Sequence, residues 1–257
     1  MSDGPRERPT SWSGVAAYGD AFADVYDDWY PDGERSAEVV ELLGVPGAGR
    51  LLELGVGTGT LAVPLARRGW SVCGLDSSAA MLERLAARAR RDRVEVAGIR
   101  GDAGDPATWP DGPFEVVLAA NNLVANLIAE HAPQRMLEGA AARLTPGGRL
   151  VVELMIVAPP PRRSRRLVAS PDTDGVRIHT DTDPATRLIR GCHVTSSGDD
   201  LELRRWTVRW IDPSALDLRA ARAGLGLDAR WAGLDRSPYV EGESPRHVST
   251  YRATRAT

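Results

Sequence analysis

The chain has 257 residues, a length that fits one α/β domain with an elaboration or a domain with a small subdomain. Its 42% hydrophobic and 26% charged residues are ordinary for a soluble globular protein. A formal net charge of −3 excludes the strongly basic surface of a typical nucleic-acid-binding protein. No apolar run approaches the roughly 18 residues of a membrane span. Every basic residue is an arginine, which excludes Schiff-base chemistry on a lysine.

Residues 1–14 carry neither the apolar core of a secretory signal nor a transit-peptide pattern, and we interpret them as a disordered leader. The two cysteines, Cys73 and Cys192, lie in separate strand-like stretches and indicate no disulfide framework. We therefore expect a cytoplasmic protein. The bias towards Arg, Ala, Gly and Pro is typical of a GC-rich bacterial genome.

Short apolar runs alternate with helical stretches in the first part of the chain. We expect strands over residues 50–54, 71–75, 94–99, 114–120 and 149–154, and helices over 61–68, 79–91 and 133–144. The alternation predicts a parallel sheet with right-handed crossovers. The near-continuous apolar character of the runs indicates that both faces of this sheet are covered.

The pattern changes after residue 158. Residues 159–166 are rich in proline and arginine, and we interpret them as a solvated linker or loop, with an anionic partner of Arg162, Arg163, Arg165 and Arg166 as the alternative. Alternating segments over residues 176–180, 187–195 and 201–211, separated by turn formers, predict an inserted antiparallel ribbon.

The last part of the chain returns to the core pattern. A helix is expected over residues 213–223, ended by Gly224, and strands over 227–231 and 247–251. The expected domains are thus a core over 15–158 that begins with lid helices, an inserted β subdomain over 159–212, and final core elements over 213–257.

The most informative segment is LLELGVGTGTL, residues 51–61. Glycines at 55, 57 and 59 allow a sharp turn from strand to helix and a close approach of the backbone to a ligand. The third glycine comes one residue too early for a dinucleotide fingerprint, with Thr60 in its place. Glu53 fits poorly beside a diphosphate but suits a ligand that carries an ammonium and a sulfonium.

Two acids follow expected strands. Asp76 comes about 20 residues after the glycine loop, where a carboxylate accepts hydrogen bonds from ribose hydroxyls. Asp102 follows the strand expected over 94–99. Because the carboxyl ends of parallel strands meet at one edge, both acids are expected in the ligand crevice.

This set of motifs, with the turn LTPGGRL before the strand at 149–154, resembles the class I S-adenosylmethionine-dependent methyltransferases over residues 15–153. The resemblance implies a seven-stranded, mostly parallel Rossmann-like sheet with helices on both faces, with 247–251 as its antiparallel strand. It implies that Glu53, Gly55 and Gly57 hold the methionine portion of the cofactor, Asp76 its ribose, and Asp102 with Ala103 its adenine. The full set expected to bind S-adenosylmethionine is Tyr18, Tyr26, Glu53, Gly55, Val56, Gly57, Thr58, Gly59, Asp76, Ser77, Met81, Gly101, Asp102, Ala103, Ala119 and Asn121.

The segment before the glycine loop also resembles bacterial small-molecule N-methyltransferases, including those that methylate amino sugars. There the tyrosines that match Tyr18 and Tyr26 form a lid over the methyl group; the alternative is an amphipathic helix that buries Phe22 and Tyr26. In this family an inserted ribbon covers the active site and sets substrate choice. The residues expected at the substrate are Tyr30, Asn122, Asn126, Trp206 and Tyr239.

The strand at 114–120 ends in Ala119-Ala120-Asn121-Asn122, without the Asn/Asp-Pro-Pro-aromatic motif of adenine-N6 methyltransferases and without acids for magnesium. No general base is evident, and the catalytic candidates are Tyr26, Asn122 and His131. The four histidines lack metal-ligand spacing, so no metal is expected. Trp206 or Trp210 is alternatively interpreted as packing the ribbon onto the core.

The sequence thus predicts transfer of a methyl group to nitrogen, or otherwise to oxygen or carbon, of a small molecule in bacterial secondary metabolism. The expected product is S-adenosylhomocysteine, and the expected protein is a monomer or homodimer with no nucleic-acid or membrane partner. Three alternatives remain open: a nicotinamide-dependent oxidoreductase, a non-catalytic S-adenosylmethionine-binding module, and an enzyme that uses the sulfonium for cyclisation or as a structural electrophile.

Overall fold

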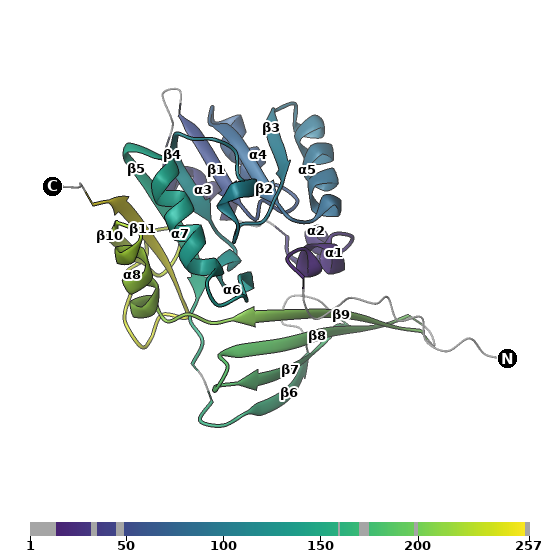
Figure 1. Cartoon of the computed structure of the whole chain (residues 1–257). Helices are drawn as coiled ribbons and strands as arrows, with labels where there is room; N and C mark the ends of the chain where they lie inside the picture. Colours follow the sequence, from purple (N-terminus) through teal and green to yellow (C-terminus); the bar gives the residue numbers. More distant parts are fainter. Residues whose placement is uncertain are drawn as a thin grey trace.

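The computed structural model describes residues 14–31, 35–44, 49–158, 160–169, 175–197 and 200–254, so most of the expected leader at 1–14 lies outside the described residues. The described chain forms a seven-stranded sheet and a separate four-stranded sheet (Figure 1). The strands of the larger sheet are β1 (Arg50–Leu54), β2 (Ser71–Asp76), β3 (Val96–Arg100), β4 (Phe114–Ala119), β5 (Leu144–Met155), β10 (Leu225–Trp231) and β11 (Arg246–Ala253).

The larger sheet has the strand order β10-β11-β5-β4-β1-β2-β3. Its strands β1 to β5 pair in parallel, and β11 runs antiparallel to both β5 and β10. The carboxyl ends of the parallel strands therefore meet at one edge, which also holds the start of β11. The predicted fold class is confirmed, including the antiparallel strand at residues 247–251.

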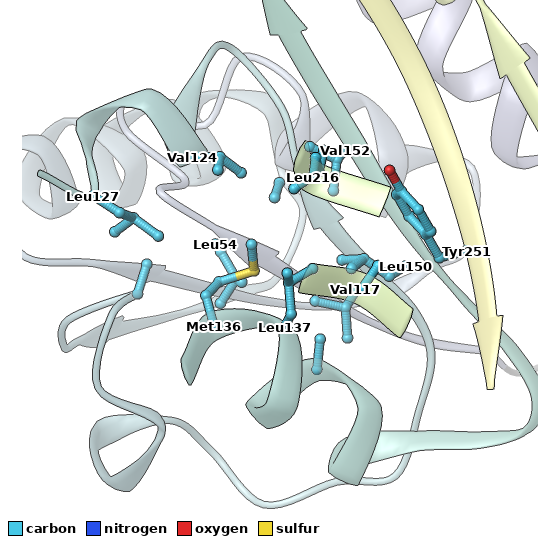
Figure 2. Close-up of a cluster of buried hydrophobic side chains, with 14 of the residues drawn as sticks. Leu54, Val117, Val124, Leu127, Met136, Leu137, Leu150, Val152, Leu216 and Tyr251 are labelled. Atoms are coloured by element: carbon cyan, nitrogen blue, oxygen red, sulfur yellow. The ribbon is translucent and has the colours of Figure 1, made fainter. Parts of the chain in front are cut away.

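Helices cover both faces of this sheet because its strands are apolar on both sides. The helices α3 (Arg35–Leu43), α4 (Ala62–Arg67) and α5 (Ala79–Asp92) bury Val39, Leu65 and Leu85 on one face. On the other face lie α6 (Leu123–Asn126), α7 (Ala132–Arg143) and α8 (Pro213–Arg222). Figure 2 shows Met136 and Leu137 of α7 packed towards Val117 and Leu150 of the sheet.

Two short helices, α1 (Ala17–Phe22) and α2 (Tyr26–Trp29), precede α3 and bury Phe22 completely. A short 3₁₀ turn at Pro106–Thr108 follows β3. No helix among the described residues is long and apolar enough to cross a membrane.

The four-stranded sheet has the order β6-β7-β8-β9 and is antiparallel throughout. Its strands are β6 (Ser164–Ala169), β7 (Arg177–Asp183), β8 (Leu188–Ser197) and β9 (Asp200–Arg209). The strand β9 runs beneath α6 and the pair α1 and α2 (Figure 1). This sheet lies within the segment 159–212, where the inserted subdomain is expected.

Two local expectations are wrong. The arginine-rich stretch is not a loop throughout, because β6 begins at Ser164 and pairs with β7. Its arginines stay at the surface, where Arg163 and Arg165 contact Asp181 at 2.6 and 3.4 Å. The turn at residues 145–148 is instead a bulge inside β5, which is in register with β4 at Leu144 and again at Arg149. The bulge forms because Gly147 adopts a φ of +83°.

Candidate active site

The glycine loop joins β1 to α4 through three residues in the left-handed region. The φ angles of Gly55, Gly57 and Gly59 are +65°, +56° and +83°, which other residues rarely adopt. The backbone N–H of Gly57 donates a hydrogen bond to Oδ2 of Asp76 at 2.8 Å. The end of β2 thus fixes the loop that follows β1.

Glu53 lies in β1 directly before this loop, with only 2% of its surface exposed. Its Oε2 atom is buried and has no hydrogen-bond partner. Burial raises the pKa of this carboxyl, and the nearby Asp76 raises it further. A buried, unpaired carboxylate oxygen is costly, so this position is suited to a cationic group of a ligand.

Asp76 ends β2 and is held at both of its oxygens. Oδ1 accepts from the backbone N–H of Ser78 at 2.9 Å, while Oδ2 accepts from Gly57. Burial raises the pKa of Asp76, and these backbone hydrogen bonds oppose the rise. Asp102 also caps its own turn, because its Oδ1 accepts from the N–H of Gly104 at 2.7 Å.

A cavity of about 320 Å³ lies at the carboxyl edge of the sheet. Its lining includes many of the residues expected to bind the cofactor, namely Tyr18, Tyr26, Gly55, Gly57, Asp76, Ser77, Met81, Gly101, Asp102, Ala103 and Asn121. Of the residues expected at the substrate, Asn126 lines it as well. The other expected cofactor residues are not part of the lining and lie buried in or beside β1, the glycine loop and β4: Glu53, Val56, Thr58, Gly59 and Ala119.

Apart from Asn126, the part of the cavity lining between α6 and α7 was not predicted. It is formed by residues of the segment from α6 to α7: Leu123, Leu127, Ile128, Ala129, Ala132 and Arg135. Arg135 is held there because its Nε donates to the carbonyl of Gly104 at 2.7 Å. Apart from Arg135 these residues are apolar, so nothing in the sequence distinguishes them from helix residues that pack in a core.

The helices α1 and α2 close one side of the cavity with Tyr18 and Tyr26. Burial raises the pKa of Tyr26 to about 12 and raises the pKa of Tyr18 as well, so both hydroxyls are neutral near pH 7. Asp20 of α1 accepts a hydrogen bond from Ser78 at 2.7 Å, and Asp27 of α2 accepts one from Thr58 at 2.6 Å. These bonds tie both helices to the cofactor edge.

The end of β4 is shaped by two asparagines with positive φ, Asn121 at +53° and Asn122 at +62°. Glu153 of β5 accepts from the backbone N–H of Asn121 at 3.0 Å and pairs with Arg35 of α3 at 2.6 Å. Arg35 also donates to Oδ1 of Asn121 at 2.7 Å. Oδ1 of Asn122 accepts from the N–H of Met155 at 2.6 Å, and Asn122 is not part of the lining.

Sequence reasoning missed both Arg35 and Glu153. The available signal was Glu153, a charged residue within an otherwise apolar strand, whose side chain is 5% exposed. Arg35 had no comparable signal, because its partner is 118 residues away.

The remaining candidates lie away from the cavity lining. His131 is exposed before the first turn of α7, and His247 is buried with its Nδ1 at 2.8 Å from Oγ of Ser249. The ring of Tyr239 lies 5.6 Å from the guanidinium of Arg230. Trp206 and Tyr30 both contact His193, at 2.9 and 3.3 Å.

Of the two tryptophans considered as packing residues, Trp210 is 4% exposed, whereas Trp206 is partly exposed. Among the residues that the structure describes, no three His, Cys, Asp or Glu side chains are grouped so that they could hold a metal ion.

Comparison with known proteins identifies the family. Residues 51–148 match the family described as Methyltransferase domain. The chain is similar to the solved CcbJ methyltransferase from Streptomyces caelestis, with 30% identity and a TM-score of 0.84 over 95% of this chain and 100% of that one. It is also similar in fold to the glycopeptide N-methyltransferase MtfA, with 20% identity and a TM-score of 0.59 over 86% and 85% of the two chains.

A curated relative is the ubiquinone biosynthesis O-methyltransferase of Caulobacter sp. (strain K31). It is 32% identical over 105 residues, which are 40% of this chain and 39% of that protein. The chain matches only 35% to 44% of the length of such curated relatives.

The site fits the cofactor of these enzymes. The orphaned carboxylate oxygen of Glu53 matches a cationic ligand group, and the glycine loop leaves space for a ligand beside Asp76. S-adenosylmethionine is therefore the cofactor and S-adenosylhomocysteine the product. The chain belongs to the class I S-adenosylmethionine-dependent methyltransferases.

Proposed function

We propose that this enzyme methylates a nitrogen atom of a small molecule in bacterial secondary metabolism, and that it works in the cytoplasm. The choice of nitrogen rests on the histidines and the lid tyrosines Tyr18 and Tyr26, none of which is a suitable base for the cavity. A hydroxyl acceptor needs a base to remove its proton, whereas a neutral amine already presents a lone pair to the methyl group.

None of the four histidines offers a base to the cavity. His131 and His179 are exposed, and neither lines the cavity. His193 and His247 are buried, and burial lowers the pKa of each to about 4, which makes both weak bases. Tyr18 and Tyr26 do line the cavity, but the raised pKa values keep their hydroxyls protonated.

We infer the following roles for the cofactor residues. Glu53 faces the ammonium and sulfonium end, with the backbone of Gly55 and Gly57 beside it, and Asp76 accepts from the ribose hydroxyls. Asp102 and Ala103 read the edge of the adenine, with Met81 against the ring. When bound, S-adenosylmethionine supplies an electrophilic methyl group on sulfur. The protein aligns the acceptor with this group and excludes water.

Tyr18 and Tyr26 are inferred to enclose the acceptor nitrogen, because they line the cavity on its lid side. Asn126 lines the opposite side and supplies a polar contact; its Oδ1 is buried and has no hydrogen-bond partner. The segment 159–212 is proposed as the substrate roof, with Tyr30 and Trp206 behind the lid. Asn122 and Tyr239 remain candidate substrate contacts outside the cavity lining.

The names of two similar proteins point to different acceptor atoms. MtfA is named a glycopeptide N-methyltransferase, while the Caulobacter relative is named an O-methyltransferase. The acceptor atom therefore varies among proteins similar to this chain, and the site chemistry supports nitrogen.

The test is a screen with purified protein, S-adenosylmethionine and matched pairs of small acceptors that differ only in an amine or a hydroxyl. Formation of S-adenosylhomocysteine is followed, and methylated products are located by mass spectrometry. Methylation of amines but not of their hydroxyl counterparts supports the proposal. Preferred methylation of oxygen or carbon, or a cyclised product from the cofactor, overturns it.

A further inference from the structure

A buried histidine connects the inserted sheet to the lid. His193 of β8 is 6% exposed and lies against Phe22 of α1 and Trp29 of α2, with ring centroids 5.1 and 5.7 Å apart. Its Nε2 is 3.3 Å from the hydroxyl of Tyr30, and its Nδ1 accepts from Nε1 of Trp206 at 2.9 Å. Both ring nitrogens therefore have a partner.

The partners fix the tautomer of His193. The indole N–H of Trp206 only donates, so Nδ1 must be unprotonated and must accept. A neutral imidazole then carries its hydrogen on Nε2, which donates to the hydroxyl oxygen of Tyr30. The low pKa of His193, about 4 through burial and the nearby Arg204, keeps the ring neutral at physiological pH.

The position of Trp206 is itself fixed by packing. Trp206 of β9 is the cross-strand partner of Gly191 in β8. A Cβ atom at Gly191 would lie 2.1 Å from Cε2 and Cζ2 of the indole, so the ring lies directly over the glycine backbone. This packing holds the indole N–H towards His193 and makes the alternative tautomer unfavourable.

Arg204 holds the two elements together beside this contact. Its guanidinium makes two hydrogen bonds to Asp24, at 2.5 and 2.9 Å, and it also donates to the carbonyl of Ala21. It lies 5.5 Å from the ring of Trp29. The segment from α1 to α2 is thus held on β9, and this attachment pre-organises Tyr30 beside His193.

Tyr30 passes this constraint on to the cavity. Its ring packs against the ring of Tyr26, with centroids 5.2 Å apart, and Tyr26 lines the cavity, whereas Tyr30 and His193 do not. We propose that His193, as the Nε2–H tautomer, is a positioning residue that fixes the hydroxyl of Tyr30 and, through the contact between the two rings, holds Tyr26 at the cofactor cavity.

The direction of the hydrogen bonds has a chemical consequence. The series of hydrogen bonds begins at the indole N–H of Trp206, which accepts no proton, and continues through the Nε2–H of His193, which donates to Tyr30. Neither ring nitrogen of His193 therefore has a free lone pair that could accept a proton from the cavity. His193 orients the lid and does not act as a general base.

The proposal is tested by binding of S-adenosylhomocysteine, measured by calorimetry on the full chain. We expect His193→Leu and Tyr30→Phe each to raise the Kd by about three- to tenfold, the size of one net hydrogen bond. The double variant should bind no more weakly than the weaker single variant, because both remove one connected path. His193→Gln, whose amide can donate to Tyr30, should restore most of the affinity.

His179→Leu is the matched control, because His179 lies on the adjacent strand β7 of the same sheet and is exposed. It should leave the Kd unchanged. Additive losses in the double variant, or an unchanged Kd in Tyr30→Phe, would overturn the proposal. If His193→Leu does not fold, Tyr30→Phe and His193→Gln still decide the outcome.

A second measurement reads the tautomer directly. Nitrogen-15 NMR of the wild-type histidines should show His193 neutral and protonated on Nε2 at pH 7, and protonation on Nδ1 would overturn the proposal. Neither experiment involves a methyl acceptor, so its outcome is independent of whether nitrogen or oxygen is methylated.

Discussion

The carboxylate of Asp76 bonds to the backbone N–H of Gly57 at 2.8 Å and so joins the end of β2 to the loop after β1. The two residues are 19 positions apart. One side chain therefore fixes the glycine loop and stands at the wall of the cavity.

Replacing Asp76 tests these two contributions together. Asp76→Ala removes both the proposed ligand contact and the bond to Gly57, and we expect the Kd for S-adenosylhomocysteine to rise by about 10- to 100-fold. Asp76→Asn retains one acceptor oxygen and should lose less affinity. Both variants should keep the circular dichroism of the wild type. An unchanged affinity in Asp76→Ala would contradict the role assigned to this carboxylate.

Glu53 should lower the stability of the ligand-free protein. The pKa of its carboxyl is higher in the folded state than in the unfolded state, so the folded protein binds the extra proton and its stability falls as pH rises above about 4.5. Glu53→Gln should remove this loss of stability. The free energy of unfolding at pH 8 should rise by roughly 1 kcal/mol, which corresponds to an increase in Tm of a few degrees. Its affinity for the cofactor should fall at the same time.

Differential scanning fluorimetry of wild type and Glu53→Gln at pH 6 and pH 8, with and without S-adenosylhomocysteine, checks both effects. A ligand-free Glu53→Gln protein that is less stable than wild type at pH 8 would refute the interpretation.

The buried histidines predict acid sensitivity. Burial lowers the pKa of His193 and His247 to about 4 in the folded protein, whereas the unfolded value is near 6.5. The unfolded state therefore binds more protons between these values, so the stability that each histidine contributes is full above pH 6.5 and falls as pH decreases towards 4.

We expect the Tm of the wild type to fall between pH 6.5 and pH 5, and to fall less in His193→Gln and in His247→Gln. The exposed His131 and His179 provide controls, since His131→Gln and His179→Gln should retain the wild-type pH dependence. Equal slopes in all four variants would show that the buried histidines do not cause the effect.

The contact between Gly191 and Trp206 predicts a steric cost. A Cβ at Gly191 would lie 2.1 Å from the indole, so Gly191→Ala should displace the ring and lower the free energy of unfolding by about 1 to 3 kcal/mol. Gly98→Ala in β3 is the matched control, because its Cβ would meet Leu85 and Leu82 at ordinary distances of 3.4 and 3.5 Å. Chemical denaturation compares the two, and equal stability would contradict the packing.

The larger sheet was predictable because its signals are local. The apolar runs that became β1 and β2 end directly at the glycine loop and at Asp76, and both strands are buried, so composition and turn residues mark them together. The strand β6 carried no such signal. Its residues are mostly exposed and rich in arginine, and only pairing with β7 makes Ser164–Ala169 a strand.

The residues of the candidate site were likewise predictable only where their signal in the sequence is local. Glu53 and Asp76 could be located because each lies next to a recognisable turn. The pair of Arg35 and Glu153 and the contact of Tyr30 with His193 join residues 118 and 163 positions apart, and no local pattern encodes either contact. Such contacts are created by the packing of α1, α2 and α3 over the carboxyl edge of the sheet.

The position of β11 has a consequence for how the protein is made. This strand lies between β5 and β10, and five of its consecutive residues, His247 to Tyr251, are almost completely buried. During synthesis, β5 and β10 emerge from the ribosome before the strand that joins them, and their facing edges stay unpaired until residue 253 is made. Unpaired strand edges bind other chains readily, so a nascent chain halted before β11 should be a target for chaperones and aggregation.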